Sequence, residues 1–379
     1  MSALSIPISG LQNDHEKRSS LGIYTKRLAI SELRVERYAL QSAVRASLMW
    51  YQGPQKLKAS RMRVIKCLRT PIATKISVLR RGDESGGSAF FRGVCLCGSV
   101  WTCPVCSAKI SEARRVELDQ ATQAWRGRGG HLGLLTLTFP HCSHDELSTS
   151  LPRFTKALQR FSMSRAFRRS WAPRAGLQHR VRATEFTFGE NGWHPHVHVL
   201  LFLDRPLVSG ISEDLVKAWQ RACIMSGLRE PSAAHGVDLR DGSYASNYVG
   251  KWGLSHELTK ANQKHGREGS RTPWDILRGV IETGQVSSAL PFVHYALATK
   301  GTRQLCWSKG ARADLGLAVE LSDDELVKEA PSKTDQLLGM IKLDQWRQIC
   351  FLPEGRTRVL EIAESQGAVG LNAFLFTLV

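Results

Sequence analysis

The segment that decides the fold reads Gly192-Trp193-His194-Pro195-His196-Val197-His198-Val199-Leu200-Leu201-Phe202. Its second half is a short apolar run of the kind that forms a buried strand. Successive side chains on a strand point to opposite faces, so His196 and His198 share one face. Imidazoles bind divalent transition metals. The segment therefore predicts a strand that presents two metal ligands, although two polar residues on a solvent-exposed face would have the same spacing.

A hairpin supplies the third ligand of this predicted site. A second predicted strand, residues 181–188, is joined to the histidine strand by a Gly-Glu-Asn-Gly turn at residues 189–192. If the two central residues form the turn, Glu185 stands directly opposite His196, and directly opposed residues share a face. We therefore expect a set of two histidines and one carboxylate, which leaves coordination positions open for a phosphate oxygen. The glutamate of the turn is the weaker candidate, and a bulge at Pro195 would break the register.

The predicted elements around this hairpin follow the order β-α-β-β-α-β. A strand at 131–139 and a helix within 145–170 precede it, and a helix at 212–226 and a strand at 236–240 follow. A further helix is expected to begin near Ser243. This order is typical of the split βαβ, ferredoxin-like arrangement, in which helices back an antiparallel sheet. The expected class is therefore α+β, with one face of the sheet open for a site.

The remaining sequence divides the chain into four expected domains. Residues 1–94 form a basic helical N-terminal region, and residues 95–130 a cysteine zinc knuckle with a helix. Residues 131–317 hold the catalytic domain. Residues 318–379 are expected to form a separate, acidic helical tail.

The charge of the chain is large and unevenly distributed. The 379 residues carry a net charge of +18, yet residues 318–379 contain six basic and ten acidic residues. Residues 24–81 contain 14 Lys or Arg and only two Glu. Surface charge that only keeps a protein soluble is more evenly mixed than this. The excess of basic residues therefore indicates a polyanionic partner, above all nucleic acid.

Four cysteines, Cys95, Cys97, Cys103 and Cys106, form a CxC-x5-CxxC cluster. Two close pairs joined by a short turn can surround Zn²⁺ with four thiolates, and buried free thiols are the alternative. Because four protein ligands leave no open coordination position, we expect the zinc to be structural. It would order a small knuckle beside the sheet.

A pair of tyrosines is the candidate nucleophile. Tyr244 and Tyr248 are four residues apart in a segment expected to be helical, and Lys251 follows on the same face. A phenol, whose ordinary pKa is about 10, is a weak nucleophile that a nearby cation can activate. Core packing is the alternative for such a pair. Tyr295 is a rival, but Lys300 lies off its helical face, which favours a core or strand position for Tyr295.

Three motifs together resemble the HUH endonucleases, and within them the rolling-circle replication initiators of plasmids and phages. They are Leu135-Thr136-Leu137-Thr138, the segment from Gly192 to His198, and Tyr248-Val249-Gly250-Lys251. The cysteine cluster also resembles a motif of some plasmid initiators. The resemblance covers about residues 90–255. One position departs from some plasmid relatives, which have glutamate where this chain has Tyr244; two tyrosines are typical of certain phage initiators and transposases.

The resemblance implies a mechanism. Glu185, His196 and His198 would hold Mg²⁺ or Mn²⁺, and Tyr248 would attack the scissile phosphate of single-stranded or hairpin origin DNA. The attack would leave a 5′-phosphotyrosine and a 3′-OH that primes a DNA polymerase. Tyr244 would be the second nucleophile, and Lys251 would bind phosphate. Since the sequence has no GxxxxGK[ST] loop, a host helicase would open the duplex.

Two other functions fit the same motifs. One is an HUH-type two-tyrosine transposase, and the other is a non-catalytic zinc-containing DNA-binding regulator whose histidines are structural. The sequence contains no run of 18 apolar residues and no secretory signal at its start. We therefore expect a cytoplasmic protein with no membrane partner.

Overall fold

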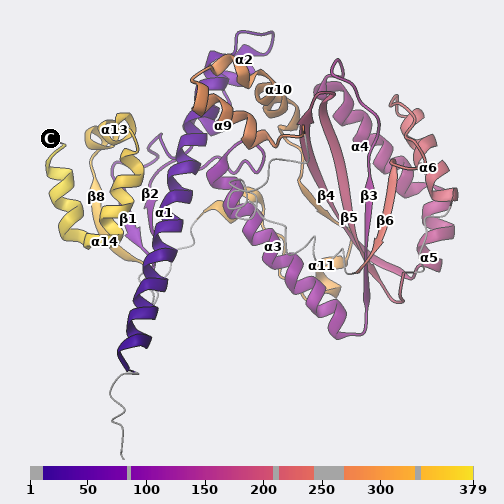
Figure 1. The fold of residues 1–379 in the computed structure, drawn as a ribbon, viewed down its shortest axis with the longest axis horizontal. Helices are drawn as coiled ribbons and strands as arrows, with labels where there is room; N and C mark the ends of the chain where they lie inside the picture. The colour runs from indigo at the N-terminus through magenta and orange to yellow at the C-terminus, as the bar shows by residue number, and fades with distance from the viewer. Residues whose placement is uncertain (1–11, 83–86, 208–212, 243–268, 329–333, 379) are drawn as a thin grey trace, which may run out of the picture. The chain divides into compact units, whose positions relative to one another are not determined.

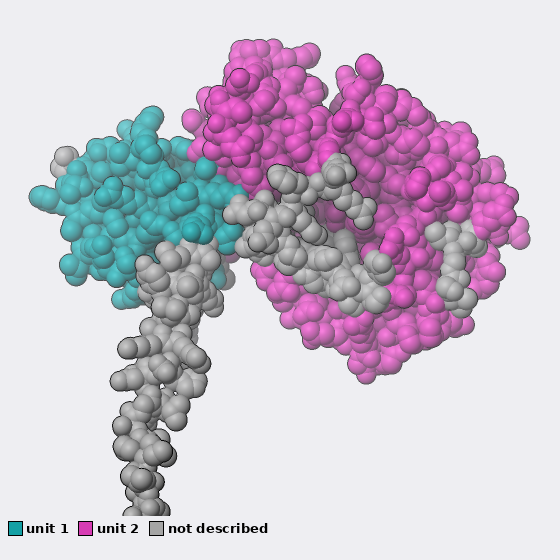
Figure 2. Space-filling model, viewed as in Figure 1, with its two compact units in different colours: residues 1–39, 67–95, 330–379 teal, residues 40–66, 96–329 magenta. Residues whose placement is uncertain are grey.

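The structure is a computed structural model that describes residues 12–82, 87–207, 213–242, 269–328 and 334–378 (Figure 1). These residues gather into two compact units (Figure 2). Unit 1 comprises residues 1–39, 67–95 and 330–379, and unit 2 comprises residues 40–66 and 96–329. This division differs from the four consecutive domains expected from the sequence, since segments from both ends of the chain belong to one unit.

A five-stranded antiparallel sheet forms the centre of unit 2 (Figure 1). Its strands, in spatial order, are β6 (Val237–Asp241), β3 (His131–Leu137), β5 (Gly192–Leu203), β4 (Leu177–Gly189) and β7 (Leu305–Trp307). Every neighbouring pair is antiparallel. The first four strands and their helices follow each other in the chain in the β-α-β-β-α-β order that the sequence predicted.

One face of this sheet is covered by α4 (Leu147–Met163) and α6 (Glu213–Ile224). Apolar residues recur along α4 at helical spacing, and Phe154 and Phe161 pack with Trp219 of α6 against the strands. Val199 is among the β5 side chains that complete this core. Burying each large apolar side chain contributes roughly 1.5–3 kcal/mol to folding.

The opposite face is covered at one end by α3 (Pro104–Gly127). Trp125 of this helix packs on Phe202, and its indole N–H donates to the carbonyl oxygen of Leu203 at 3.1 Å. Leu200 and Phe202 alternate with the residues that face α4, as a strand requires. His196 and His198 have the same parity as Leu200, so they lie on the α3 face of the sheet beyond the helix.

The other described helical elements of unit 2 that begin after α1 have 11 residues or fewer. Between α4 and β4 the chain forms a π-helix, η2 (Ala166–Trp171), and α5 (Ala172–Arg174). The rest are α2 (Lys56–Ser60), η1 (Arg63–Lys66), α9 (Pro273–Thr283), η3 (Val286–Ala289), α10 (Leu290–Thr299), α11 (Ala311–Asp314) and α12 (Asp323–Val327). None of the helices in the described part of the chain has the length and apolar character needed to cross a bilayer.

Unit 1 is built on a three-stranded antiparallel sheet in the order β2 (Ala89–Arg92), β1 (Ile76–Arg80) and β8 (Gln336–Ile341). Helix α14 (Gly355–Phe376) packs against all three strands, and α13 (Leu343–Phe351) packs on α14. The part of α1 (Gln12–Trp50) that precedes residue 40 contacts α14, where Arg34 donates to Glu364.

Unit 1 therefore corrects the expected purely helical ends of the chain. Val78 of β1 is fully buried in its core, and Phe91 of β2 packs edge-on against Trp346. The strands β1 and β8 are more than 250 residues apart in the chain. A local sequence pattern carries no information on a pairing partner at that distance.

Candidate metal centre

The β4–β5 hairpin has the register expected from the sequence. Gly189 pairs with Gly192 and Glu185 pairs with His196. Pro195 pairs with Phe186 without a bulge; the one irregularity of this ladder lies near Leu177, far from the turn. Gly192 has a φ of +81°, the left-handed conformation that glycine adopts at low cost. The hairpin therefore places the carboxylate and the first histidine side by side on one face.

Glu185, His196 and His198 form a compact group of potential metal ligands. The His196 Nε2 atom lies 3.4 Å from the Glu185 Oε2 atom, and the His198 Nε2 atom lies 3.8 Å from the same oxygen. One ligand atom from each residue lies within 4.8 Å of the others. Two imidazole nitrogens and a carboxylate oxygen are a donor set that suits divalent transition metals and leaves positions open.

The Nδ1 atoms of both imidazoles already have hydrogen-bond partners. The His198 Nδ1 atom is 2.9 Å from the Thr136 hydroxyl, and the His196 Nδ1 atom donates to the carbonyl oxygen of His194 at 3.4 Å. Partners at Nδ1 fix the ring orientation and leave Nε2 available to a metal, as is common for metal-binding histidines. Strand pairing explains the first contact, because Thr136 of β3 is directly opposite His198. The donor set and its supports therefore fit a divalent metal ion.

Burial and the nearby carboxylate move the pKa values of the two ligand imidazoles in opposite directions. Burial lowers the pKa of His198 and outweighs the attraction of Glu185. Burial also acts to lower the pKa of His196, but the hydrogen bond and charge of Glu185, with the His194 carbonyl, raise it overall. His198 is thus a neutral, ready ligand at neutral pH. A metal at His196 competes with a more tightly held proton.

A second pair of histidines, which the sequence did not single out as a pair, lies beside this group. The His194 and His141 rings are 4.7 Å apart between centroids, and the His194 Nε2 atom bonds the Thr138 hydroxyl. Burial, followed by the charges of His196 and His141, lowers the pKa of His194 to about 4. The alternation of the Leu-Thr-Leu-Thr motif was a usable signal, since it predicts that the hydroxyls of Thr136, in β3, and Thr138, which follows β3, point to the same side. His194 is therefore a neutral group at the rim of the site.

The expected nucleophiles cannot be placed. Tyr244, Tyr248 and Lys251 lie outside the described residues. The rival Tyr295 is 3% exposed on α10 and stacks on Trp193 with a 4.9 Å centroid distance. Tyr295 is a core residue, as its sequence context indicated.

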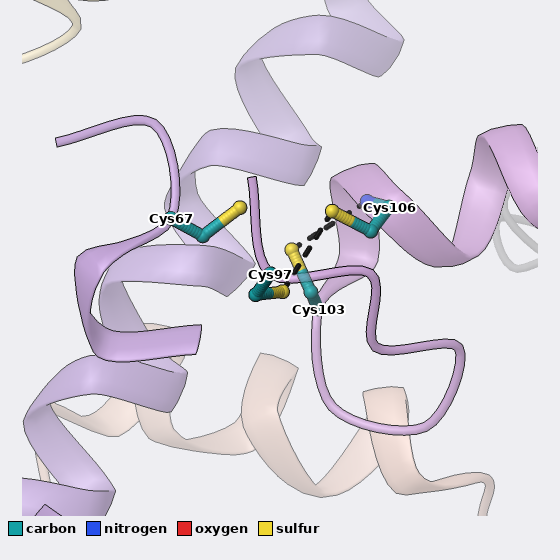
Figure 3. A group of neighbouring side chains, drawn as sticks. All are labelled: Cys67, Cys97, Cys103 and Cys106. Carbon is teal, nitrogen blue, oxygen red and sulfur yellow. Dashed lines mark hydrogen bonds between the residues drawn. The ribbon is translucent and has the colours of Figure 1, made fainter. Parts of the chain in front are cut away.

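Four buried cysteines, Cys67, Cys97, Cys103 and Cys106, form a second group of potential ligands, with their sulfur atoms within 4.8 Å of one another (Figure 3). The Sγ atoms of Cys97 and Cys106 are 3.7 Å apart. Cys103 is the N-cap of α3, where its Sγ atom accepts from the Cys106 N–H at 3.5 Å. Four converging thiols are the donor set of a structural zinc site.

This group differs from the expected one because Cys67 takes the position predicted for Cys95. Cys95 is partly exposed, and its backbone exchanges hydrogen bonds with the segment 68–70. The antiparallel bridge between Pro71 and Val94 continues through these bonds, which brings the chain around Cys67 alongside the segment that follows Cys95. The pairing is non-local, so the CxC spacing could not reveal it.

Comparison with known proteins finds similarity to replication proteins. Residues 91–222 match the family model described as replication protein. The chain is 27% identical to "Protein rep" of Streptomyces lividans over 362 residues, which covers 76% of this chain and 78% of that protein. It is 32% identical over 143 residues to a protein of Streptomyces cyanogenus named neomycin resistance protein, covering 31% of this chain and 33% of the relative. No solved structure matches.

The family match spans β3, α4, β4 and β5, and with them all three residues of the Glu185, His196 and His198 group. The similarity to Protein rep extends over most of both chains. This chain is therefore similar to replication proteins, and the similarity includes the residues of the candidate metal centre.

Proposed function

We propose that this protein is a plasmid rolling-circle replication initiator that nicks and rejoins single-stranded origin DNA. The observation that carries the proposal is the convergence of Glu185, His196 and His198 on one face of the β4–β5 hairpin, within the segment that matches the replication protein family model. Structural histidines would not need a carboxylate opposite them or hydroxyl and carbonyl partners at both Nδ1 atoms. The strand order β6-β3-β5-β4 with helices between the strands supports the split βαβ fold of HUH endonucleases.

The three ligands would hold Mg²⁺ or Mn²⁺. Such an ion polarises the scissile phosphate and stabilises the charge that develops on its oxygens. The protein's own contribution is to hold the donor atoms in place: Thr136 fixes His198 and the His194 carbonyl fixes His196. Burial keeps His198 neutral, so its Nε2 lone pair is available at neutral pH.

Tyr248 is the proposed nucleophile, on the strength of its spacing from Lys251 and of the motif they share with HUH initiators. Its oxygen forms a bond to the scissile phosphorus as the bond from phosphorus to the 3′ oxygen breaks. The products are a 5′-phosphotyrosine and a 3′-OH, and the energy of the phosphodiester is conserved in the new ester. Tyr244 is proposed to act in the second transfer that rejoins the strand, and Lys251 to bind phosphate.

The cysteine group is proposed to hold structural Zn²⁺. Four buried thiols leave no open coordination position, so the metal would serve folding and not catalysis. The proposed partners are origin DNA, a host helicase and a host DNA polymerase, in the cytoplasm.

Incubation of the full-length protein with a single-stranded origin oligonucleotide and Mn²⁺ tests this function. We expect a covalent protein–DNA adduct that Tyr248→Phe abolishes. We expect Tyr244→Phe to retain the first cleavage and to lose rejoining. Absence of an adduct from metal-loaded protein on every strand of the cognate origin would leave a non-catalytic DNA-binding role. Excision of flanking DNA ends in place of origin nicking would identify a transposase.

A further inference from the structure

The segment from residue 147 to residue 184 has an unusual charge pattern. It contains nine Lys or Arg and no Asp or Glu. Most of the segment forms α4, η2 and α5, which lie on the face of the sheet opposite the metal centre. This charge serves no part of the proposed nicking site, whose ligands lie on the α3 face.

On α4, Arg153 and Lys156 are exposed and Arg160 is partly exposed, because the apolar residues of this helix point inward. Phe154 and Phe161 of α4 pack in the core of unit 2. Arg153, Lys156 and Arg160 then fall within about 60° of one another around the same helix, at roughly 100° per residue. They span about 10 Å along the axis, close to three base-pair steps of duplex DNA.

The π-helix extends this basic surface. Phe167 and Trp171 are four residues apart, stack with their ring centroids at 5.5 Å, and are buried against the sheet. Their burial leaves Arg165, Arg168 and Arg169 exposed. π-helical turns are rare and are found frequently at functional sites.

The exposed cations share one further property. They are Arg153, Lys156, Arg165, Arg168, Arg169 and Arg174, which we call the α4–α5 strip. Among the described residues of the chain, none of these six forms an ion pair with a carboxylate. Exposed cations elsewhere in unit 2 commonly do, as in the pairs Arg205–Asp204 and Lys217–Glu213, both with a 2.7 Å separation. The strip therefore offers uncompensated positive charge to a polyanion.

We propose that the α4–α5 strip binds the phosphate backbone of duplex DNA that flanks the nicking site. This inference rests on the proposed nicking function and adds a duplex-binding surface to it. The aromatic side chains distinguish a duplex from a single strand. Proteins that hold single strands combine cations with exposed aromatic rings on which bases stack. All four aromatic residues between positions 147 and 184 are buried, namely Phe154, Phe161, Phe167 and Trp171. The strip thus presents charge without a stacking surface, as backbone binding to paired DNA requires.

The test measures how the affinity of the full-length protein for a short duplex without origin sequence depends on KCl concentration. In a plot of the logarithm of the association constant against the logarithm of the KCl concentration, each cation that neutralises one phosphate of B-DNA makes the slope steeper by about 0.9. The triple variant Arg165→Ala, Arg168→Ala, Arg169→Ala should therefore lower this steepness by up to about 2.7 and weaken duplex binding at every salt concentration. The charge-retaining variant with lysine at all three positions should restore most of both losses.

A matched control removes three cations that already have carboxylate partners: Arg115→Ala, Arg205→Ala, Lys217→Ala. This variant loses the same formal charge and should change the slope much less. An unchanged slope in the strip variant overturns the proposal, as does an equal change in the control. A loss confined to single-stranded DNA would assign the strip to the other nucleic acid form and also overturns it. Adduct formation on a single-stranded oligonucleotide, measured in parallel, should persist in the strip variant and tests the nicking function separately.

Discussion

Thr136→Val removes one hydroxyl group from the support of the metal centre. In the wild type the Thr136 hydroxyl lies 2.9 Å from His198 Nδ1, and the His198 side chain is 18% exposed. Valine has nearly the same shape and is well suited to a strand, so the change isolates the hydrogen bond. A partly buried N–H without an acceptor costs about 1–2 kcal/mol. We therefore expect the dissociation constant for Mn²⁺ to rise roughly 5- to 30-fold, which overlaps the roughly 10- to 100-fold loss typical of a metal ligand that loses its hydrogen-bond partner.

Calorimetric titration with Mn²⁺ measures this effect. Thr136→Ser keeps the hydroxyl and should bind the metal nearly as the wild type does. Thr138→Val is the matched control: it removes the hydroxyl of the threonine just after β3, which bonds His194 and not a proposed metal ligand. The reasoning is refuted if Thr136→Val, with an unchanged thermal unfolding profile, binds Mn²⁺ as tightly as the wild type, or if Thr138→Val weakens binding equally.

Three further predictions concern pH, thiol chemistry and packing. Burial acts to raise the pKa of Glu117, but its hydrogen bonds with Arg312 and Arg114 lower the pKa overall. The Glu117 carboxylate stabilises the fold at pH values above its pKa in the unfolded chain. This stabilisation disappears as the pH falls through its lower pKa in the folded protein. The melting temperature should thus drop less steeply below about pH 4 in Glu117→Gln than in the wild type; parallel curves would contradict this. Burial raises the pKa of Cys223 to about 12, so iodoacetamide at neutral pH should label this thiol only after denaturation, as peptide mass spectrometry can show. Phe154→Ala should cost about 3–5 kcal/mol of unfolding free energy in urea titrations, because Phe154 is 1% exposed in the main core; a cost below about 1 kcal/mol would show that the core is misassigned.

The parts of the site that the sequence predicted correctly depend on short-range geometry. A strand has a side-chain period of two, and a two-residue turn leaves one register for the hairpin. These two constraints were enough to place Glu185 opposite His196 and on the face of His198. The order of strands and helices in unit 2 likewise follows from apolar periodicity and turn residues.

The features that the sequence did not predict depend on contacts between distant segments. Thr136 meets His198 through the pairing of β3 with β5, and β1 finds β8 from the other end of the chain. Cys67 reaches the cysteine group through the backbone pairing of residues 68–72 with 93–95, whereas a spacing rule points to Cys95. Periodicity reports which face of an element is buried, but not which element will cover it.

The central claim is that Glu185, His196 and His198 hold a divalent ion through two imidazoles. Electron spin echo spectroscopy of the Mn²⁺-loaded protein tests it most directly, because coupling to imidazole nitrogen identifies the ligands themselves. We predict coupling to two nitrogens, reduced to one in His198→Ala, with a loss of Mn²⁺ affinity in Glu185→Gln. A bound Mn²⁺ ion without nitrogen coupling, or one whose spectrum is unchanged in His198→Ala, would contradict the claim.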